Sequence, residues 1–226
     1  MAKFARIIHQ NNEIFLIKKF IRFFKAEIKK KKKNRFSFVL TGGNSPIRLY
    51  KELAKDKSIN WKKIDFFIGD ERYVKETSKN SNIKMCKKYL LNKIKISKKQ
   101  IYNISTEKIS IKKSVIDYEN KIKKYFLGKN INFDLILLGI GSDGHIASLF
   151  KNNIFIKNNK NVKSVKSKDF LRISLTLKCI NNSKNIFLWG PGVNKINIIK
   201  RILEDTKHKY PASFLKEKNN FLFYCN

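Results

Sequence analysis

Asp143 and His145, in one glycine-rich turn, are the residues of this sequence best suited to acid–base chemistry. A histidine with an unperturbed pKa near ~6.5 can accept a proton from water at neutral pH, and a nearby carboxylate can orient its ring. The other histidines, His9 and His208, lie in terminal or lysine-rich surroundings typical of a surface. His145 is therefore the candidate general base. A helix cap or a hydrogen-bonded structural histidine is the alternative.

The same turn contains Gly139, Gly141 and Gly144 at the spacing of a dinucleotide-binding fingerprint. We expect no dinucleotide there, because Asp143 would repel a pyrophosphate and residues 144–168 contain no carboxylate for a ribose. A Gly-x-Ser-x-Gly nucleophile motif and metal-ligand spacings are also absent from the sequence. No metal is predicted.

A second glycine turn, Gly42-Gly43-Asn44-Ser45, lies between an apolar run and an amphipathic segment that opens at Pro46. Paired glycines let the backbone approach a ligand, and the positive end of a helix favours an anion. The turn is a candidate phosphate site, with a plain strand-to-helix turn as an equal alternative.

Three further charged groups lie near predicted element ends. Asp70-Glu71-Arg72 follows an apolar run, Arg172 alternates with apolar residues, and Lys195 follows Gly190-Pro191-Gly192. Arginine can clamp phosphate in a bidentate way, and lysine can offer its ammonium. Each has an ordinary alternative: a surface turn, an exposed strand residue, and one lysine among many. They are candidates because several predicted strand ends each carry a polar cluster, and active sites are assembled from such ends.

The elements that must position these groups alternate in the manner of a parallel sheet covered on both faces. We predict an α/β, Rossmann-like, doubly wound fold in a single domain over 1–226, with about 151–180 as an alternative small lobe. Predicted strands are 36–41, 64–69, 101–104, 133–139, 171–177, 186–190 and 221–225; predicted helices are 14–30, 46–55, 81–92, 114–126 and 192–204.

The net charge of +34 over 226 residues would ordinarily indicate a polyanion-binding protein. That charge comes from 44 Lys and only 7 Arg, spread along a chain rich in Ile and Asn. A dedicated nucleic-acid binder would favour arginine. We therefore attribute the charge to compositional drift and expect no specific nucleic-acid partner, although the field would still attract an anionic substrate.

Cellular context follows from smaller features. The three cysteines are odd in number and far apart, which favours free thiols in a reducing compartment. No signal peptide or long apolar stretch is apparent. We expect a cytoplasmic protein without membrane contact.

Several segments in this order resemble the 6-phosphogluconolactonase family, a branch of the group that includes glucosamine-6-phosphate deaminase. They are TGGNSP near 41, the stretch 61–74 with DER, SN at 81–82, DLILLGIGSDGHIASLF (134–150), RISLTL (172–177) and GPGVNKINIIKRIL (190–203). The resemblance implies hydrolysis of 6-phosphoglucono-1,5-lactone to 6-phosphogluconate in the pentose phosphate pathway, without a cofactor. We expect a monomer or homodimer.

Two departures from the family pattern are Lys151-Asn152 where Pro-Gly is usual, and Asn44-Ser45 where Ser-Thr is usual. The deaminases of the group read Asp-Glu-Tyr instead of Asp-Glu-Arg and place a glutamate shortly after the histidine. Here residues 146–168 contain no carboxylate. This difference favours the lactonase, with a deaminase-like sugar-phosphate enzyme and a basic nucleic-acid-binding protein as alternatives.

The resemblance and the strand-end positions together give a set of expected site residues. His145 is expected to activate water, Asp143 to orient the ring, and Arg72 to stabilise charge on the carbonyl oxygen. Expected catalytic residues are His145, Asp143, Arg72 and Asp70; expected substrate-binding residues are Gly42, Gly43, Asn44, Ser45, Gly144, Arg172 and Lys195.

Overall fold

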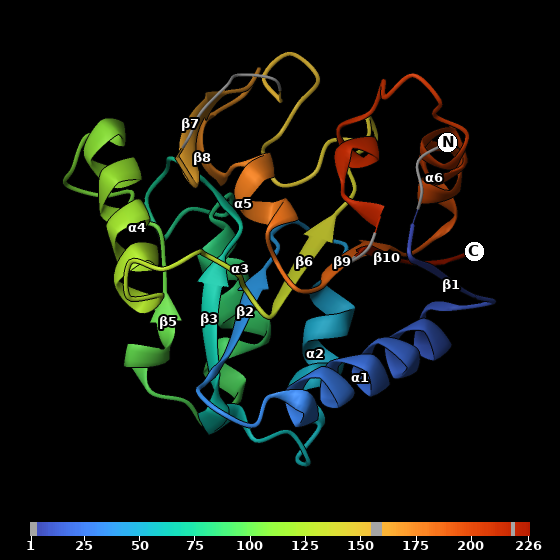
Figure 1. Ribbon diagram of the computed structural model, residues 1–226, viewed down its shortest axis with the longest axis horizontal. Coiled ribbons are helices and arrows are strands. Elements are labelled where there is room, and N and C mark those ends of the chain that lie inside the picture. Colours follow the sequence, from blue (N-terminus) through green and yellow to red (C-terminus); the bar gives the residue numbers. More distant parts are fainter. Residues whose placement is uncertain (1–3, 155–159, 218–219) are drawn as a thin grey trace.

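The computed structural model describes residues 4–154, 160–217 and 220–226, which contain a sheet of seven parallel strands (Figure 1). The strand order is β1-β10-β9-β6-β2-β3-β5. The predicted doubly wound α/β fold with a mostly parallel sheet is confirmed. The strands are β1 (Arg6–Gln10), β2 (Phe36–Leu40), β3 (Ile64–Ile68), β5 (Ile101–Tyr102), β6 (Leu135–Gly139), β9 (Ile186–Gly190) and β10 (Asn220–Cys225).

The helices begin where a polar side chain can satisfy the free N–H groups of the first turn. Asn12, Ser81, Ser110 and Thr176 each accept a hydrogen bond from such an N–H. The α-helices are α1 (Glu13–Lys30), α2 (Ile47–Lys55), α3 (Asn82–Tyr89), α4 (Ile111–Tyr125), α5 (Leu177–Asn181) and α6 (Val193–Leu203). Short 3₁₀ helices are η1 (Trp61–Lys63), η2 (Leu91–Lys93), η3 (Lys98–Gln100) and η4 (Pro211–Phe214).

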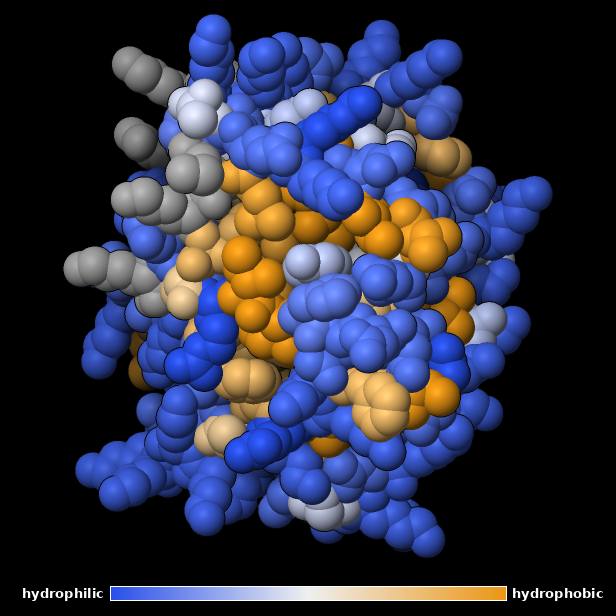
Figure 2. All heavy atoms as spheres, turned by 90° about the vertical axis from the view of Figure 1, so that its right-hand side faces the viewer, coloured by the Kyte–Doolittle hydropathy of each residue, from blue (hydrophilic) through white to orange (hydrophobic). Residues whose placement is uncertain are grey.

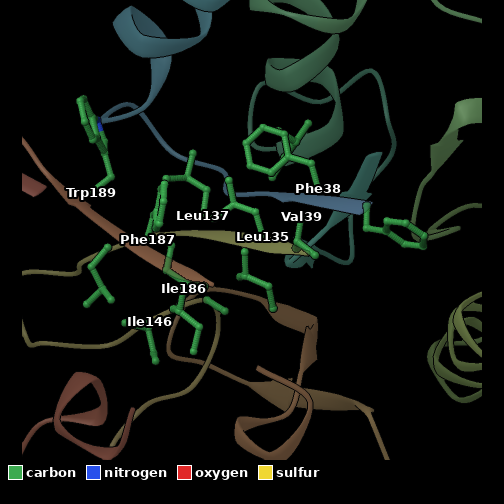
Figure 3. Packing of buried hydrophobic residues seen from close by; sticks show 14 of the residues in the cluster. Phe38, Val39, Leu135, Leu137, Ile146, Ile186, Phe187 and Trp189 are labelled. Atoms are coloured by element: carbon green, nitrogen blue, oxygen red, sulfur yellow. The ribbon is translucent and has the colours of Figure 1, made fainter. Parts of the chain in front are cut away.

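The middle strands of the sheet are buried on both faces. Every residue of β2, β3 and β9 is buried, and Figure 3 shows side chains of β2, β6 and β9 projecting to both sides. On one side, Phe24 of α1 lies 4.9 Å from Phe38 of β2, measured between ring centroids. Burial of each such side chain stabilises the fold by about 1.5–3 kcal/mol. The sheet is therefore a rigid platform for the loops at its strand ends.

A second, three-stranded sheet contains β4 (Asp70–Arg72), β7 (Val162–Lys166) and β8 (Leu171–Leu175) in the order β4-β8-β7. Both strand pairs are antiparallel. In Figure 1 the β7–β8 hairpin lies beyond the carboxyl ends of β2 and β3. The prediction of a single domain over 1–226, with about 151–180 as an alternative small lobe, stays a prediction.

β1 forms one edge of the large sheet and pairs only with β10 among the described residues. Figure 2 views the side of the molecule that carries β1 and α6, where apolar side chains gather inside a polar rim. Ile7, Phe15 and Val193 are 47%, 51% and 71% exposed. Within the described ranges, no helix is both long enough and apolar enough to cross a membrane. All three cysteines are buried and free.

Several expected boundaries were wrong. α4 begins at Ile111 because Ser110 caps it, one turn before the predicted start. The strand predicted over 171–177 ends at Leu175, because Thr176 caps α5. The helix predicted over 81–92 ends at Tyr89, and Pro46 is the N-cap of α2. β1 and β7 were not predicted, since their sequences RIIHQ and VKSVK are short and mixed in polarity.

Candidate active site

A cavity of about 360 Å³ lies where β2, β3, β6 and β9 end. Strand ends of this kind are where an open α/β sheet binds ligands. The cavity lining comes from six separate parts of the chain. It comprises Thr41, Gly42, Gly43, Asn44, Ser45, Asp70, Arg72, Asn82, Gly139, Ile140, Gly141, His145, Ala147, Arg172, Asn194 and Lys195.

His145 and Asp143 form a close pair at the turn after β6. Nδ1 of His145 lies 2.5 Å from Oδ1 of Asp143, and the two side chains are 29% and 60% exposed. Partial burial of Asp143 opposes its ionisation, but the charge and hydrogen bonds of His145 lower the pKa of that carboxyl below its usual value. The carboxylate favours a proton on Nδ1, which leaves Nε2 as the acceptor nitrogen.

The turn holds the imidazole against the backbone. The N–H of Gly141 donates to the carbonyl of His145 at 2.8 Å, and Gly144 adopts φ 78°. A Cβ on Gly141 would lie 2.1 Å from Nδ1 of His145, inside van der Waals contact. The glycine spacing that resembles a dinucleotide fingerprint therefore makes room for a histidine ring here.

The His145 ring packs against the Phe150 ring in a tilted arrangement, with 4.6 Å between the ring centroids and 43° between the ring planes. The guanidinium carbon of Arg172 lies 5.5 Å from the centroid of the Phe150 ring. Phe150 therefore restrains a candidate base and a candidate anion-binding group together.

Arg72 on β4 pairs directly with Arg172 on β8. Both guanidinium groups lie near the Phe170 ring, at 5.9 Å and 5.8 Å from its centroid. Nη1 of Arg72 donates to the carbonyl of Asn80 at 2.7 Å, whereas its buried Nε has no hydrogen-bond partner among the described residues. Two neighbouring guanidinium groups that both line the cavity form a place for an anion.

Asp70 lines the cavity but its carboxylate is already engaged. Oδ2 accepts a hydrogen bond from Oγ of Ser148 at 2.6 Å and lies 4.0 Å from Nη1 of Arg172. Oδ1 lies 3.4 Å from Nδ2 of Asn82. These contacts suit a group that orients Arg172 more than one that transfers a proton.

The turn Gly42–Ser45 and Lys195 form another cationic part of the lining. Gly43 adopts φ 80°, and no side chain among the described residues caps the N-terminus of α2. Nε1 of Trp189 donates to the Ser45 carbonyl at 3.1 Å. Lys195 lies in the first turn of α6 and has no ion-pair partner among the described residues. Uncapped N–H groups beside a free ammonium can bind a phosphate.

The structure brings most of the predicted site residues into one cavity. Only Asp143 and Gly144 are outside the lining, where one supports His145 and the other shapes its turn. Of the lining residues that were not predicted, Asn82 had a signal in the Ser-Asn pair at 81–82, and Gly139 and Gly141 had one in their spacing. The others, Thr41, Ile140, Ala147 and Asn194, lie in segments that carry the family resemblance, but their residue types indicated no chemistry.

Among the described residues, no three His, Cys, Asp or Glu side chains are grouped so that they could hold a metal ion. The prediction that the protein works without a metal or cofactor stays a prediction.

Comparisons with known proteins agree with this arrangement. The sequence model of the family described as glucosamine-6-phosphate isomerases/6-phosphogluconolactonase matches residues 12–223. The chain is 33% identical over 194 residues to the 6-phosphogluconolactonase of Thermotoga maritima, covering 85% of this chain and 84% of that protein. It is 32% identical over 193 residues to the 6-phosphogluconolactonase of Synechocystis, covering 83% and 80%. The crystal structure of the Thermotoga maritima 6-phosphogluconolactonase superposes with a TM-score of 0.84 at 29% identity, covering 97% and 99% of the two chains.

Proposed function

Because the chain belongs to the glucosamine-6-phosphate isomerase/6-phosphogluconolactonase family, we propose that it hydrolyses 6-phosphoglucono-1,5-lactone to 6-phosphogluconate in the pentose phosphate pathway. One observation carries the proposal beyond family membership. His145, backed by Asp143, shares a cavity with two arginines and a lysine. A neutral ester that carries a phosphate needs both a base and cations.

In this mechanism, Nε2 of His145 takes a proton from a water molecule as its oxygen attacks C1 of the lactone. Asp143 keeps the ring oriented and stabilises the imidazolium that forms. When the C1–O5 bond breaks, the same proton passes from His145 to the departing ring oxygen. The C1 acid then ionises. No covalent enzyme intermediate is required, because the lactone is already a reactive ester.

Charge on the former carbonyl oxygen is stabilised by Arg72, whose side chain lines the cavity. A well-placed donor to such an oxyanion contributes about 3 kcal/mol to the transition state. Asp70 orients Arg172 through their 4.0 Å contact. Asp70 thus has a positioning role in this proposal.

The 6-phosphate binds to Gly42, Gly43, Asn44 and Ser45 with Lys195, and Arg172 adds a second cation. The shape of the turn and the free ammonium support this assignment. Gly144 contributes through the turn that carries His145. Fixing the phosphate positions C1 against the base, which accelerates the reaction by holding the groups together.

A deaminase reaction on glucosamine 6-phosphate is the nearest alternative within the family. It is disfavoured because residues 146–168 contain no carboxylate to assist ring opening. The deciding experiment supplies freshly made lactone and measures 6-phosphogluconate with a coupled dehydrogenase, beside an ammonia assay on glucosamine 6-phosphate. Lactone turnover well above the uncatalysed rate supports the proposal, whereas ammonia release without it contradicts the proposal.

We further propose a cytoplasmic enzyme that acts as a monomer or homodimer, without a membrane or a specific nucleic-acid partner. In this proposal the net charge of +34 attracts polyanions only weakly and does not recognise them specifically. A steep salt dependence of tight nucleic-acid binding would contradict this part of the proposal.

A further inference from the structure

Glu71, in the middle of β4, is 1% exposed and does not line the cavity. Its carboxylate accepts four hydrogen bonds. Oε1 accepts from the N–H of Arg72 at 2.8 Å and of Asn82 at 2.7 Å. Oε2 accepts from the N–H of Ile83 at 2.8 Å and from Oγ of Ser81 at 3.2 Å. No cation forms an ion pair with it among the described residues.

Two of these donors are the first N–H groups of α3, which begins at Asn82. Ser81 caps only the next N–H, that of Lys84. A carboxylate at this helix end is favoured by the helix dipole and satisfies donors that would otherwise be buried without partners. Glu71 therefore fixes the start of α3 relative to β4.

Asn82 carries this constraint into the cavity. Its Nδ2 donates to the backbone carbonyl of Asp70 at 2.8 Å. Its amide group also packs against Gly42, because a Cβ on Gly42 would lie 2.0 Å from Cγ of Asn82. A continuous set of contacts therefore joins Glu71, Asn82 and the turn that begins at Gly42.

We propose that Glu71 is a positioning residue for substrate binding: it holds Asn82 against Gly42 and so sets the shape of the anion-binding turn. This inference rests on the proposed function, since the anion is taken to be the phosphate of the lactone. The carboxylate itself does not touch the substrate. A purely structural cap on α3 would change stability without changing the affinity for substrate.

Replacement of Glu71 by Gln is the direct test. Only the oxygen of the glutamine amide can accept a hydrogen bond. Its NH₂ group must therefore face the donors that the second carboxylate oxygen of Glu71 had accepted from. Glu119 of α4 offers a matched control, since it is also buried and accepts from the N–H groups of Asn161 and Val162, at 2.9 Å and 2.8 Å. It is not part of the cavity lining.

At pH 7.5, with the uncatalysed rate subtracted, we expect Glu71→Gln to raise KM about 10-fold while kcat changes less than about 3-fold. Glu119→Gln should leave KM within about 2-fold of wild type. A KM for Glu71→Gln no higher than that of Glu119→Gln overturns the inference. If Glu71→Gln does not fold, Glu71→Asp, which shortens the side chain by one carbon, is held to the same comparison.

A double-mutant cycle with Asn82→Ala tests the route of the effect. If Glu71 acts through Asn82, the KM of the double variant should equal that of Asn82→Ala alone. Independent, multiplicative effects on KM would overturn the assignment.

The two proposals can fail separately. An inactive wild-type protein would count against lactone hydrolysis alone. The side-chain amide resonance of Asn82 in ¹H–¹⁵N spectra then tests Glu71 without any substrate. A shift in Glu71→Gln that is absent from Glu119→Gln supports the positioning role, and an unchanged resonance overturns it.

Discussion

Arg72 and Arg172 lie directly opposite each other on antiparallel strands, and the ring of Phe170 lies within 5.9 Å of both guanidinium carbons. Like charges in this position destabilise a strand pair. The aromatic ring and Asp70 offset part of that repulsion, and a bound anion would offset more. The site is thus arranged for a negatively charged ligand before one arrives.

Arg72→Lys tests whether the planar guanidinium matters beyond its charge. A lysine keeps the charge but loses the fork and the packing on Phe170, so we expect kcat to fall about 100-fold, as for loss of an oxyanion donor. Arg48→Lys, at an exposed ion pair with Glu13, should leave kcat unchanged. Full activity in Arg72→Lys would remove Arg72 from the mechanism.

His145→Ala should reduce lactone hydrolysis by at least ~100-fold, the usual effect of losing a general base. Steady-state kinetics with the uncatalysed rate subtracted gives the measurement. His9, whose ring contacts Tyr224 and Asn226 at the sheet edge, provides the control, and His9→Ala should retain wild-type turnover. Near-normal turnover in His145→Ala would refute the base assignment.

Gly141→Ala and Gly139→Ala separate two interpretations of the glycine spacing. A methyl group at Gly141 would meet Nδ1 of His145 at 2.1 Å, whereas one at Gly139 would meet only Oγ1 of Thr41 at 3.6 Å. We expect kcat to fall about 100-fold in the first variant, approaching the loss of the base itself, and to change little in the second. Equal losses in both would indicate that the glycines serve some other purpose.

Lys195→Ala should raise KM by about 10- to 100-fold, because a hydrogen bond to a charged group contributes about 1.5–3 kcal/mol. Lys200→Ala, in the exposed last turn of the same helix, should have a KM close to that of wild type. The salt dependence of KM provides a second measurement. Salt screens the nonspecific attraction of substrate to the protein equally in both variants, so a KM difference between them comes from the local contact of Lys195. Identical KM values would contradict a phosphate contact at Lys195.

Stability should depend on pH through Glu71. Burial raises the pKa of this carboxyl from 4.5 to about 7, against the opposing effect of its donors. Between these values the folded protein retains a proton that the unfolded chain has released, so this contribution is complete below about 4.5 and is lost as the pH rises through about 7. The shift corresponds to at most about 3 kcal/mol.

Urea unfolding of wild type and Glu71→Gln at pH 5 and pH 8 measures this term. The decrease in unfolding free energy from pH 5 to pH 8 should be smaller in Glu71→Gln than in wild type, because glutamine does not titrate. The same loss in both proteins would assign the pH dependence to other groups.

Local sequence patterns were sufficient to predict which polar clusters lie at strand ends and therefore belong to the candidate site. The run 133–139 is apolar apart from Asp134, so β6 and the turn to His145 could be located, and the clusters at Gly42 and Asp70 likewise follow apolar runs. Where these clusters meet follows from the rule that parallel strands end on one edge of the sheet.

The contacts between clusters could not be predicted in this way. Neighbouring side chains on a strand point to opposite faces, so Glu71 meets α3 while Arg72 pairs with Arg172, about 100 residues later. Phe150 becomes a partner of Arg172 only once β8 is in place. Such relationships depend on long-range pairing, which no local period encodes.

The pairing of β1 has a consequence for the order of assembly during translation. Its partner strand lies far along the chain, as the contact between Ala5 and Asn220 across 215 positions shows. On the ribosome, residues 6–10 must therefore wait, with their backbone groups exposed to water, until the last strand emerges. The apolar side chain of Ile7, which is 47% exposed even in the folded protein, has no strand beside it throughout that interval.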